Sequence, residues 1–401
     1  MSKKRVCDRY IILETLFYLH SGIIGATYIL YFYDLGYSKF VTNIITSVFN
    51  IFVFIFEIPS GSLSDNRGNK SALIISGIAL SSSMALFLYA GNISILILGQ
   101  IFWGISYAMQ SGALEAWVVN TADLDDNELD AVFSKSAKIR NFVMILGGVI
   151  GTFIAKAGLR YIWIIPLITA IIYTLLVLRW VRNQQLNQSK FHTYNFKMNV
   201  RSELKESFIT IYDTIRKGDS IKTILLLNMG VAFVISPLFT YWSPYILQLG
   251  GGELGVLAWM WIFIKISMTA GNALWEHLHK KYNRIQALFV ICILFGSIFI
   301  IAAINSNLLV GFAVIIGMEI LLGVLDPIQK ALINKYIDSD NRATMLSVNS
   351  MAERVGGWIS LVLMGILGDV FSIGITWIIA GVTMLFLCIF ISRLKRNPKI
   401  L

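Results

Sequence analysis

Twelve apolar stretches, separated by polar segments, constrain this 401-residue chain more than any other feature. Most of them approach the ~17–25 residues that carry an α-helix across a bilayer. Strands are disfavoured as spanning elements, because an open sheet edge in lipid leaves backbone groups without hydrogen bonds. The expected spans are Ile11–Phe32, Phe40–Ile58, Ala72–Ala90, Ile95–Trp117, Phe142–Ala157, Tyr161–Leu178, Ile221–Leu247, Gly255–Trp275, Ile285–Ile304, Leu308–Leu325, Val355–Leu367 and Ile373–Ile391.

The composition agrees with a bilayer environment. Hydrophobic residues make up 56% of the chain and charged residues only 14%, against roughly 25% charged residues in ordinary soluble domains. The apolar run after the basic start MSKKRVCDRY is too long for a signal-peptide core and has no small-residue cleavage site. We therefore expect an all-α polytopic membrane protein whose first span is retained.

Lysine and arginine are distributed unevenly between the two sides of the expected membrane. With a cytoplasmic N-terminus, 29 of the 33 Lys and Arg residues fall in inner segments. Positive residues concentrate on the cytoplasmic side, so both termini are expected inside the cell membrane. The net charge of +10 is then explained by topology and contact with anionic lipid, and nucleic acid is not an expected partner.

A polar stretch divides six spans from six. The expected organisation is an N-terminal bundle at 1–182, a cytoplasmic linker at 183–220 and a C-terminal bundle at 221–401. A shift of 214 residues lays the segment Leu124–Arg140 over Asp338–Arg354, so that Arg140 meets Arg354. Two pseudo-symmetric six-helix bundles are the plan of a secondary transporter.

The segment EIPSGSLSDNRGNK, from Glu57 to Lys70, is a dense polar interruption between two apolar runs. It is expected to form the cytoplasmic loop between the second and third spans. Gly61 allows close helix approach and Gly68 permits a tight turn. Asp65 can meet an opposing helix N-terminus or an arginine of the other half, in particular Arg354. Such a contact would hold the cytoplasmic side shut and release it when the halves rock.

This segment resembles the loop signature of the major facilitator superfamily, roughly G-x-L-a-D-r-x-G-r-k. The matching positions are Gly61, Leu63, Asp65, Gly68 and Lys70, while Asn66 stands where a basic residue is usual and Arg67 follows it. The resemblance covers the whole chain in topology. It implies alternating access to a small-molecule substrate, no cofactor, no catalysis and function as a monomer. No glycine-rich phosphate loop is present for ATP, so an ion gradient is the expected energy source.

Two signatures of drug-exporting branches of the superfamily are incomplete. Gln100 stands in the fourth span where those exporters usually carry arginine, four residues before Gly104. In the fifth span, the segment from Gly147 to Thr152 lacks the usual proline and last glycine, although Gly147 and Gly151 still allow close helix packing. These departures weaken the antiport interpretation.

Charges inside the spans are the candidate proton or substrate sites, because each costs ~2.5–3.5 kcal/mol or more in the membrane. Lys265 and Glu319 lie well inside their spans, and mutual pairing is the simplest account of both; the pair would be structural, or would open when a proton or an ionic substrate replaces one partner. Asp326 is two helical turns after Glu319 and precedes Pro327, where the helix is expected to break. The resemblance implies that spans one, four, seven and ten line the cavity. The acids expected to face it are Glu14, Glu115, Glu319 and Asp326.

Three functions compete at this stage. A proton-coupled exporter of amphiphilic drugs or metabolites leads, because acids outnumber bases in the spans and aromatic residues reach 13%. A proton-coupled uptake symporter is second, favoured by the incomplete exporter signatures. A membrane sensor or enzyme is third; it would need a clustered catalytic set or an appended domain, and neither is visible in the sequence. His20, inside the first span, is either a proton relay or a hydrogen-bonded packing residue.

Overall fold

The computed structural model describes residues 2–181, 219–336 and 342–395. In these ranges the chain is helical and contains no strand. The linker expected at 183–220 lies almost entirely outside the described residues, as does the start of the segment Asp338–Arg354. The chain divides into two compact units. Unit 1 contains Met1–Asp34 and Ile45–Arg201, and unit 2 contains Leu35–Ile44 and Ser202–Leu401.

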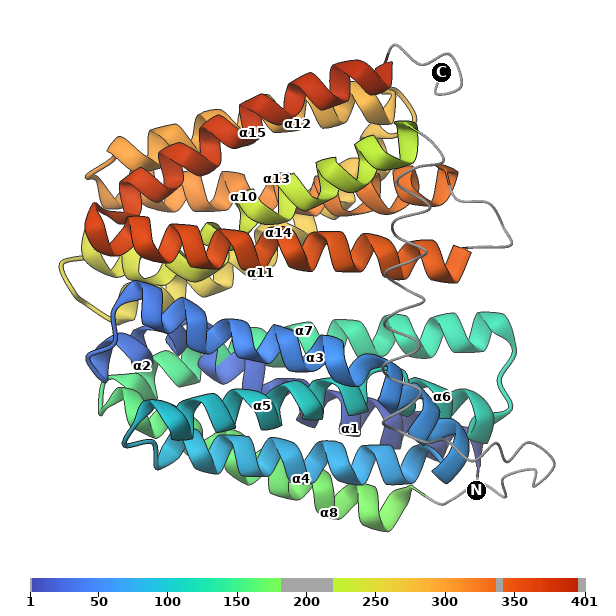
Figure 1. The fold of residues 1–401 in the computed structure, drawn as a ribbon. Helices are drawn as coiled ribbons and strands as arrows, with labels where there is room; N and C mark the ends of the chain where they lie inside the picture. The colour runs from blue at the N-terminus through green and yellow to red at the C-terminus, as the bar shows by residue number, and fades with distance from the viewer. Residues whose placement is uncertain (1, 182–218, 337–341, 396–401) are drawn as a thin grey trace. The chain divides into compact units, whose positions relative to one another are not determined.

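Figure 1 labels the helices of both units. The first part of the chain forms α1 Lys3–Gly25, α2 Tyr28–Asp34, α3 Lys39–Arg67, α4 Asn69–Leu88, α5 Ile93–Gln110, α6 Ala113–Ala122, α7 Asp126–Ala155, the short 3-10 helix η1 Leu159–Trp163, and α8 Ile164–Trp180. The second part forms α10 Asp219–Leu249, α11 Gly255–Leu278, α12 Arg284–Ile304, α13 Leu308–Tyr336, α14 Arg342–Val370 and α15 Ile373–Lys395.

Within the described residues, eleven helical segments are long and apolar enough to cross a membrane, and the pair α1 and α2, bent by 51°, makes a twelfth candidate. Each expected span coincides with one of these segments. Two of them are interrupted. The first bends after Gly25, a weak helix former, and the fourth breaks between α5 and α6 at Gly112, whose φ of 75° favours glycine.

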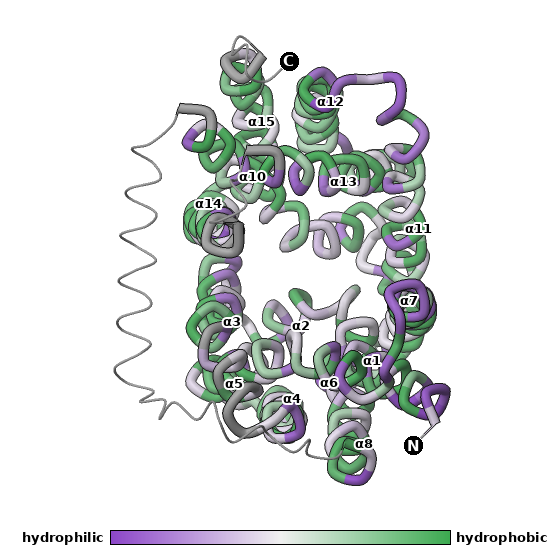
Figure 2. Tube along the Cα trace, turned by 90° about the vertical axis from the view of Figure 1, so that its right-hand side faces the viewer, coloured by the Kyte–Doolittle hydropathy of each residue, from purple (hydrophilic) through white to green (hydrophobic). Residues whose placement is uncertain are grey.

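Several helices extend well beyond the expected spans. The residues from Leu124 to Arg140 were expected in a loop, but α7 begins at Asp126 and includes most of them. A reciprocal capping box explains this start, because Asp125 accepts from the backbone of Glu128 while the Glu128 side chain accepts from the backbone of Asp125. Figure 2 colours this start of α7 as hydrophilic, in contrast to the apolar length of α12.

Large apolar side chains cover the outside of each unit. Ile78, Leu175, Val290 and Phe386 are 54%, 59%, 52% and 57% exposed. A soluble protein would not present so many exposed apolar side chains on its helices. These surfaces suit contact with lipid.

Glycines set the closest helix contacts inside each unit. In unit 1, a Cβ on Gly151 of α7 would overlap the carbonyl oxygen of Ile23, and a Cβ on Gly22 would lie 2.8 Å from the backbone of Met144. The close packing expected at Gly147 and Gly151 is therefore the contact of α7 with α1. In unit 2, Gly296 of α12 meets Gly381 of α15 in the same way.

The beginning of α3 belongs to unit 2 and is capped by α14. Asp369 of α14 accepts hydrogen bonds from the backbone amides of Lys39 and Phe40 at 2.8 and 2.9 Å. Lys39 Nζ also lies 3.9 Å from the same carboxylate. A carboxylate at a helix N-terminus satisfies free amides and favours the helix dipole, so Asp369 fixes where α3 starts.

Candidate functional site

In unit 1, a buried carboxylate joins α1 to α7. Glu14 is 7% exposed, accepts a hydrogen bond from Ser136 Oγ and forms a salt bridge with Arg140. The Arg140 guanidinium also lies 4.9 Å from the ring centroid of Tyr18, one helical turn after Glu14. The close glycine contact of α1 with α7 brings these side chains within reach. Glu14 is thus neutralised inside its own unit, a pairing that the sequence did not predict.

Glu115 lies beside this cluster but is less enclosed. It is exposed on the first turn of α6, where its charge is favoured by the helix dipole. Tyr10 of α1 interacts electrostatically with both Glu14 and Glu115. Glu14 and Glu115 therefore share one neighbour and have different environments, since of these two only Glu14 is paired with a base.

His20 is a packing residue with a fixed tautomer. It is 1% exposed, and Trp103 Nε1 donates to its Nε2 at 3.0 Å. An indole N–H can only donate, so Nε2 accepts and the proton of the neutral ring lies on Nδ1, which donates to the carbonyl of Phe17. Of the two alternatives for His20, the geometry is that of a hydrogen-bonded core histidine.

In unit 2, Lys265 of α11 and Glu319 of α13 interact without touching. Both lie near the middle of their helices, and Glu319 is 3% exposed. Each acts electrostatically on the other, yet no N···O contact of 4 Å or less joins these two described side chains. The Lys265 ammonium instead stands 4.3 Å from the ring centroid of Trp261. The direct ion pair expected from the sequence is not formed.

Trp261 connects Lys265 to a second helix. Its ring stacks on that of Trp242 of α10, with centroids 6.2 Å apart and an interplanar angle of 25°. Cation–π contact with tryptophan contributes ~0.5–2 kcal/mol, which offsets part of the cost of holding an ammonium in a membrane span. Lys265 is half-buried and has no hydrogen-bond acceptor among the described residues.

Asp326 occupies a different environment from Glu319 although both lie on α13. Its carboxylate is exposed and pairs with Lys330 at 2.7 Å, one turn later on the same helix. The expected break at Pro327 is wrong, because α13 continues to Tyr336 with the proline inside it. Neighbouring helices and side chains can compensate the lost backbone hydrogen bond.

The signature segment is mostly helical. α3 runs to Arg67 with Pro59 inside it, and the chain turns at Gly68, where φ is 83°. Gly61 is exposed, with nothing within 4 Å of the position a Cβ would take, so the close helix approach expected there is absent from the described chain. Leu63 and Lys70 are half-buried. The side chains of Asp65 and Arg67 lie outside the described residues.

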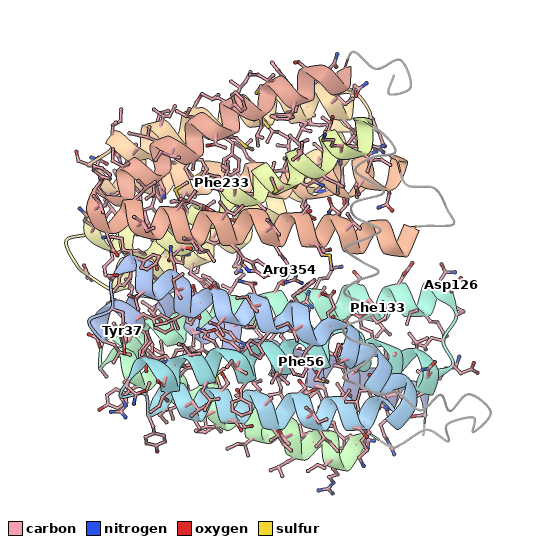
Figure 3. All side chains as sticks on the ribbon, in the orientation of Figure 1. Tyr37, Phe56, Asp126, Phe133, Phe233 and Arg354 are labelled. Carbon is pink, nitrogen blue, oxygen red and sulfur yellow. The ribbon has the colours of Figure 1, made fainter. Side chains whose placement is uncertain are left out.

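Arg354, the expected partner of Asp65, lies on α14 and is half-buried (Figure 3). The residue before it, Glu353, was not among the sequence candidates. Glu353 ends a chain of amide side chains that joins α13, α10 and α14 through Gln329, Asn228 and Asn349. The 214-residue shift could have pointed to two of these amides, because it aligns Asn228 with Glu14 and Gln329 with Glu115. In the described part of the chain, no group of three or more His, Cys, Asp or Glu side chains could hold a metal ion.

Apolar helices of membrane-spanning length, two units and a few ionisable side chains within the spans together define a multi-pass transporter-like membrane protein. The chain matches the sequence profile of the Major Facilitator Superfamily over residues 10–360 and 224–400. It belongs to that superfamily.

Known relatives agree with this assignment. The chain is 21% identical over 390 residues to the uncharacterized MFS-type transporter YxaM of Bacillus subtilis (strain 168), covering 94% of both chains. The fold is similar to that of the nucleoside transporter NupG, with a TM-score of 0.78, 12% identity and coverage of 98% of this chain and 99% of the other. It is also similar to a D-xylose-proton symporter, with a TM-score of 0.71, 14% identity and coverage of 96% of each chain.

Proposed function

We propose that the protein is a proton-coupled transporter that moves a small organic molecule with an acidic group in the same direction as the proton. The observation that supports this most is the arrangement of Lys265. Its ammonium makes a cation–π contact with Trp261 and interacts electrostatically with Glu319. It forms no direct salt bridge or hydrogen bond with the Glu319 carboxylate. A carboxylate or phosphate of the substrate is the group that would bind there.

Electrostatics then links the substrate to the proton. When the acidic group of the substrate lies at Lys265, Glu319 has a second negative charge nearby and binds a proton more readily. By reciprocity, a proton on Glu319 removes its negative charge from the vicinity of Lys265. The ammonium then attracts the acidic group of the substrate more strongly, and the substrate binds more tightly. Ligands that favour each other's binding travel together, which is symport.

Proton-coupled export of amphiphilic drugs or metabolites was the leading expectation from the sequence. It depended on the aromatic content and on an excess of acids in the spans, which would favour a cation as substrate. Glu14 is paired with Arg140, and Asp326 is paired with Lys330. Fewer uncompensated acids remain to attract a cation, so we propose import of an acidic or zwitterionic solute in place of export of a cation.

The topology is also part of the proposal. We propose a monomeric transporter in the cell membrane with both termini cytoplasmic, supported by the 29 of 33 Lys and Arg residues on the inner side of that arrangement. The signature segment and Arg354 then lie at the cytoplasmic side, where Asp65 would close the transporter against the second half.

Proton uptake on binding tests the proposed function. Purified protein would be screened by thermal stabilisation with carboxylates, amino acids, sugar phosphates and quaternary ammonium compounds. Calorimetry of each stabilising ligand in two buffers of different ionisation heat gives the protons taken up or released. We expect acidic ligands to bind with proton uptake. Stabilisation by quaternary ammonium compounds alone, with proton release, would contradict the proposal and favour antiport.

A further inference from the structure

A directed chain of hydrogen bonds crosses three helices of unit 2. Gln329 Nε2 of α13 donates to Asn228 Oδ1 of α10 at 3.0 Å, and Asn228 Nδ2 donates to Asn349 Oδ1 of α14 at 2.6 Å. Asn349 Nδ2 then donates to Glu353 Oε1 at 2.7 Å. The chain therefore begins at an amide on α13 and ends at a carboxylate on α14.

The carboxylate dictates the direction of the whole chain. An ionised carboxylate can only accept, so Asn349 must present its NH₂ group to Glu353 and its oxygen to Asn228. Asn228 must in turn present its oxygen to Gln329. Asn228 and Asn349 are 2% and 8% exposed, and an amide buried in the wrong orientation would leave polar atoms unsatisfied at a cost of about 1–3 kcal/mol.

The same three-helix position in unit 1 has different chemistry. The 214-residue shift aligns Asn228 with Glu14, and Arg354 with Arg140. In unit 1 the acid lies on α1 and is fixed by a salt bridge to Arg140. In unit 2 an amide replaces that acid, and the carboxylate of Glu353 lies on α14 with no salt bridge to any described residue. The unit 2 acid is held by a neutral amide, so a proton can bind it without breaking an ion pair.

We propose that Glu353 binds a second proton during transport and that this proton reverses the hydrogen-bond chain. The inference rests on the proposed proton coupling and adds a residue to it. The proton comes from water, forms an O–H bond on Glu353 and returns to water when it leaves; no other covalent bond changes. Protonated Glu353 can donate to Asn349. The side-chain amide of Asn349 then rotates so that its oxygen faces Glu353 and its NH₂ group donates to Asn228. Asn228 then donates to the oxygen of Gln329.

The reversal would connect protonation on α14 to the helix that carries Glu319. Gln329 lies ten residues after Glu319 on α13, and it changes from donor to acceptor when the chain reverses. Among the described residues, the charged groups that act on Glu353 are Asp326 and Lys330 of α13 and Arg354 of α14. The described residue that α10 contributes to the chain, Asn228, is neutral. Few charged groups therefore influence proton binding to Glu353, and two of them, Asp326 and Lys330, form a salt bridge with each other.

Infrared difference spectroscopy of the purified protein tests this proposal without substrate or transport. Spectra recorded from about pH 5 to about pH 9 show the C=O stretch of each carboxyl that gains a proton in that interval. We expect one band to disappear in Glu353→Gln and to remain in Glu319→Gln. If Glu353→Gln loses no band, the proposal is wrong, whatever the transport assays show.

The amide variants test the chain itself and keep Glu353 in place. Asn349→Leu removes the donor to the ionised carboxylate, and we expect the midpoint of the Glu353 band to move up by about one pH unit. Gln329→Leu, at the far end, should move it in the same direction by less. Ser350→Ala, beside Asn349 but outside the chain, should leave it unchanged. Equal midpoints in all three variants would contradict a chain that responds to the proton.

Failure of the proposed function and failure of the Glu353 proton site give different results. If Glu319→Gln has no effect on gradient-driven transport while the Glu353 band behaves as expected, the proposed function fails and the proton site stands. If transport is proton-coupled but Glu353→Gln changes neither the infrared band nor the pH dependence of substrate exchange, the second site fails and the proposed function stands.

Discussion

Arg140 of α7 forms a salt bridge with Glu14 of α1, and Glu14 is 7% exposed in its unit. Arg140, one of the positive residues expected on the cytoplasmic side, is therefore half-buried and held by a buried acid of the first bundle. Buried ion pairs contribute little net stability when intact but are costly to break, because the remaining charge is stranded. This asymmetry makes the pair a test of the unit 1 structure.

We predict that Arg140→Met lowers stability and that Glu14→Gln added to it recovers much of the loss. Removing one partner of a buried pair costs roughly 3–5 kcal/mol, and the lower end applies here because Arg140 is 28% exposed. Ser136→Ala, which removes a single hydrogen bond to the carboxylate, should cost about 1.5 kcal/mol. Thermal unfolding in detergent measures all three. A double variant no more stable than Arg140→Met would show that the pair is not the cause.

For the cytoplasmic gate, we predict that Asp65→Arg and Arg354→Asp each abolish transport and that the double exchange restores part of it. The expected contact joins Asp65 of the signature segment to Arg354 of the other half, and charge reversal at one end turns attraction into repulsion. Lys70→Asp serves as a control for a general loss of positive charge on the same loop. Normal transport by both single variants, with normal expression and folding, would exclude the contact.

At the substrate site, we predict that Lys265→Met lowers affinity for the acidic ligand by about ten- to a hundredfold and changes the melting temperature little. A charge-assisted hydrogen bond contributes roughly 1.5–3 kcal/mol, and Lys265 has no direct salt bridge whose loss would strand Glu319. Lys265→Arg keeps the charge and should lose less. A marked fall in melting temperature that Glu319→Gln repairs would instead indicate that the two residues act as a structural pair.

For proton coupling, we predict that Glu319→Gln abolishes accumulation driven by a pH gradient and leaves exchange of substrate at equal pH. The neutral amide removes the proton site but keeps the size of the side chain. Asp326→Asn is the matched control on the same helix: its carboxylate is exposed and bound to Lys330, so accumulation should continue. Glu14→Gln and Glu115→Gln neutralise the two remaining candidate proton sites. If all four variants still accumulate substrate, the coupled proton binds elsewhere or another ion drives transport.

Hydropathy was sufficient to predict the membrane spans, because the apolar lengths of α10, α12 and α15 are set by the bilayer and not by packing. Helix ends were less predictable. α7 continues to Asp126 outside the apolar run, and its cap is a short polar motif, Asp125 with Glu128 three residues later. That motif is readable in the sequence. It lies outside the apolar run, so hydropathy alone does not predict it.

Side-chain partners were the least predictable part of the site. The depth of Glu319 and Lys265 in their spans could be judged from the sequence, but a difference of a few ångströms decides between a salt bridge and the observed contact with Trp261. Glu353 was missed because it is close to the expected end of its span, where an acid is inexpensive. Its direct partner, Asn349, lies one turn earlier on α14, and the other two amides of the chain come from α10 and α13.

The direction in which the ligand accumulates under a pH gradient shows whether proton and acidic substrate move together. Protein would be reconstituted in liposomes with the membrane potential held at zero, and a ligand identified by the binding screen would be supplied at equal concentration on both sides. We predict that an alkaline interior causes the ligand to accumulate inside and that an acidic interior causes it to leave. Accumulation toward the acidic side, or no response to the gradient, would contradict symport.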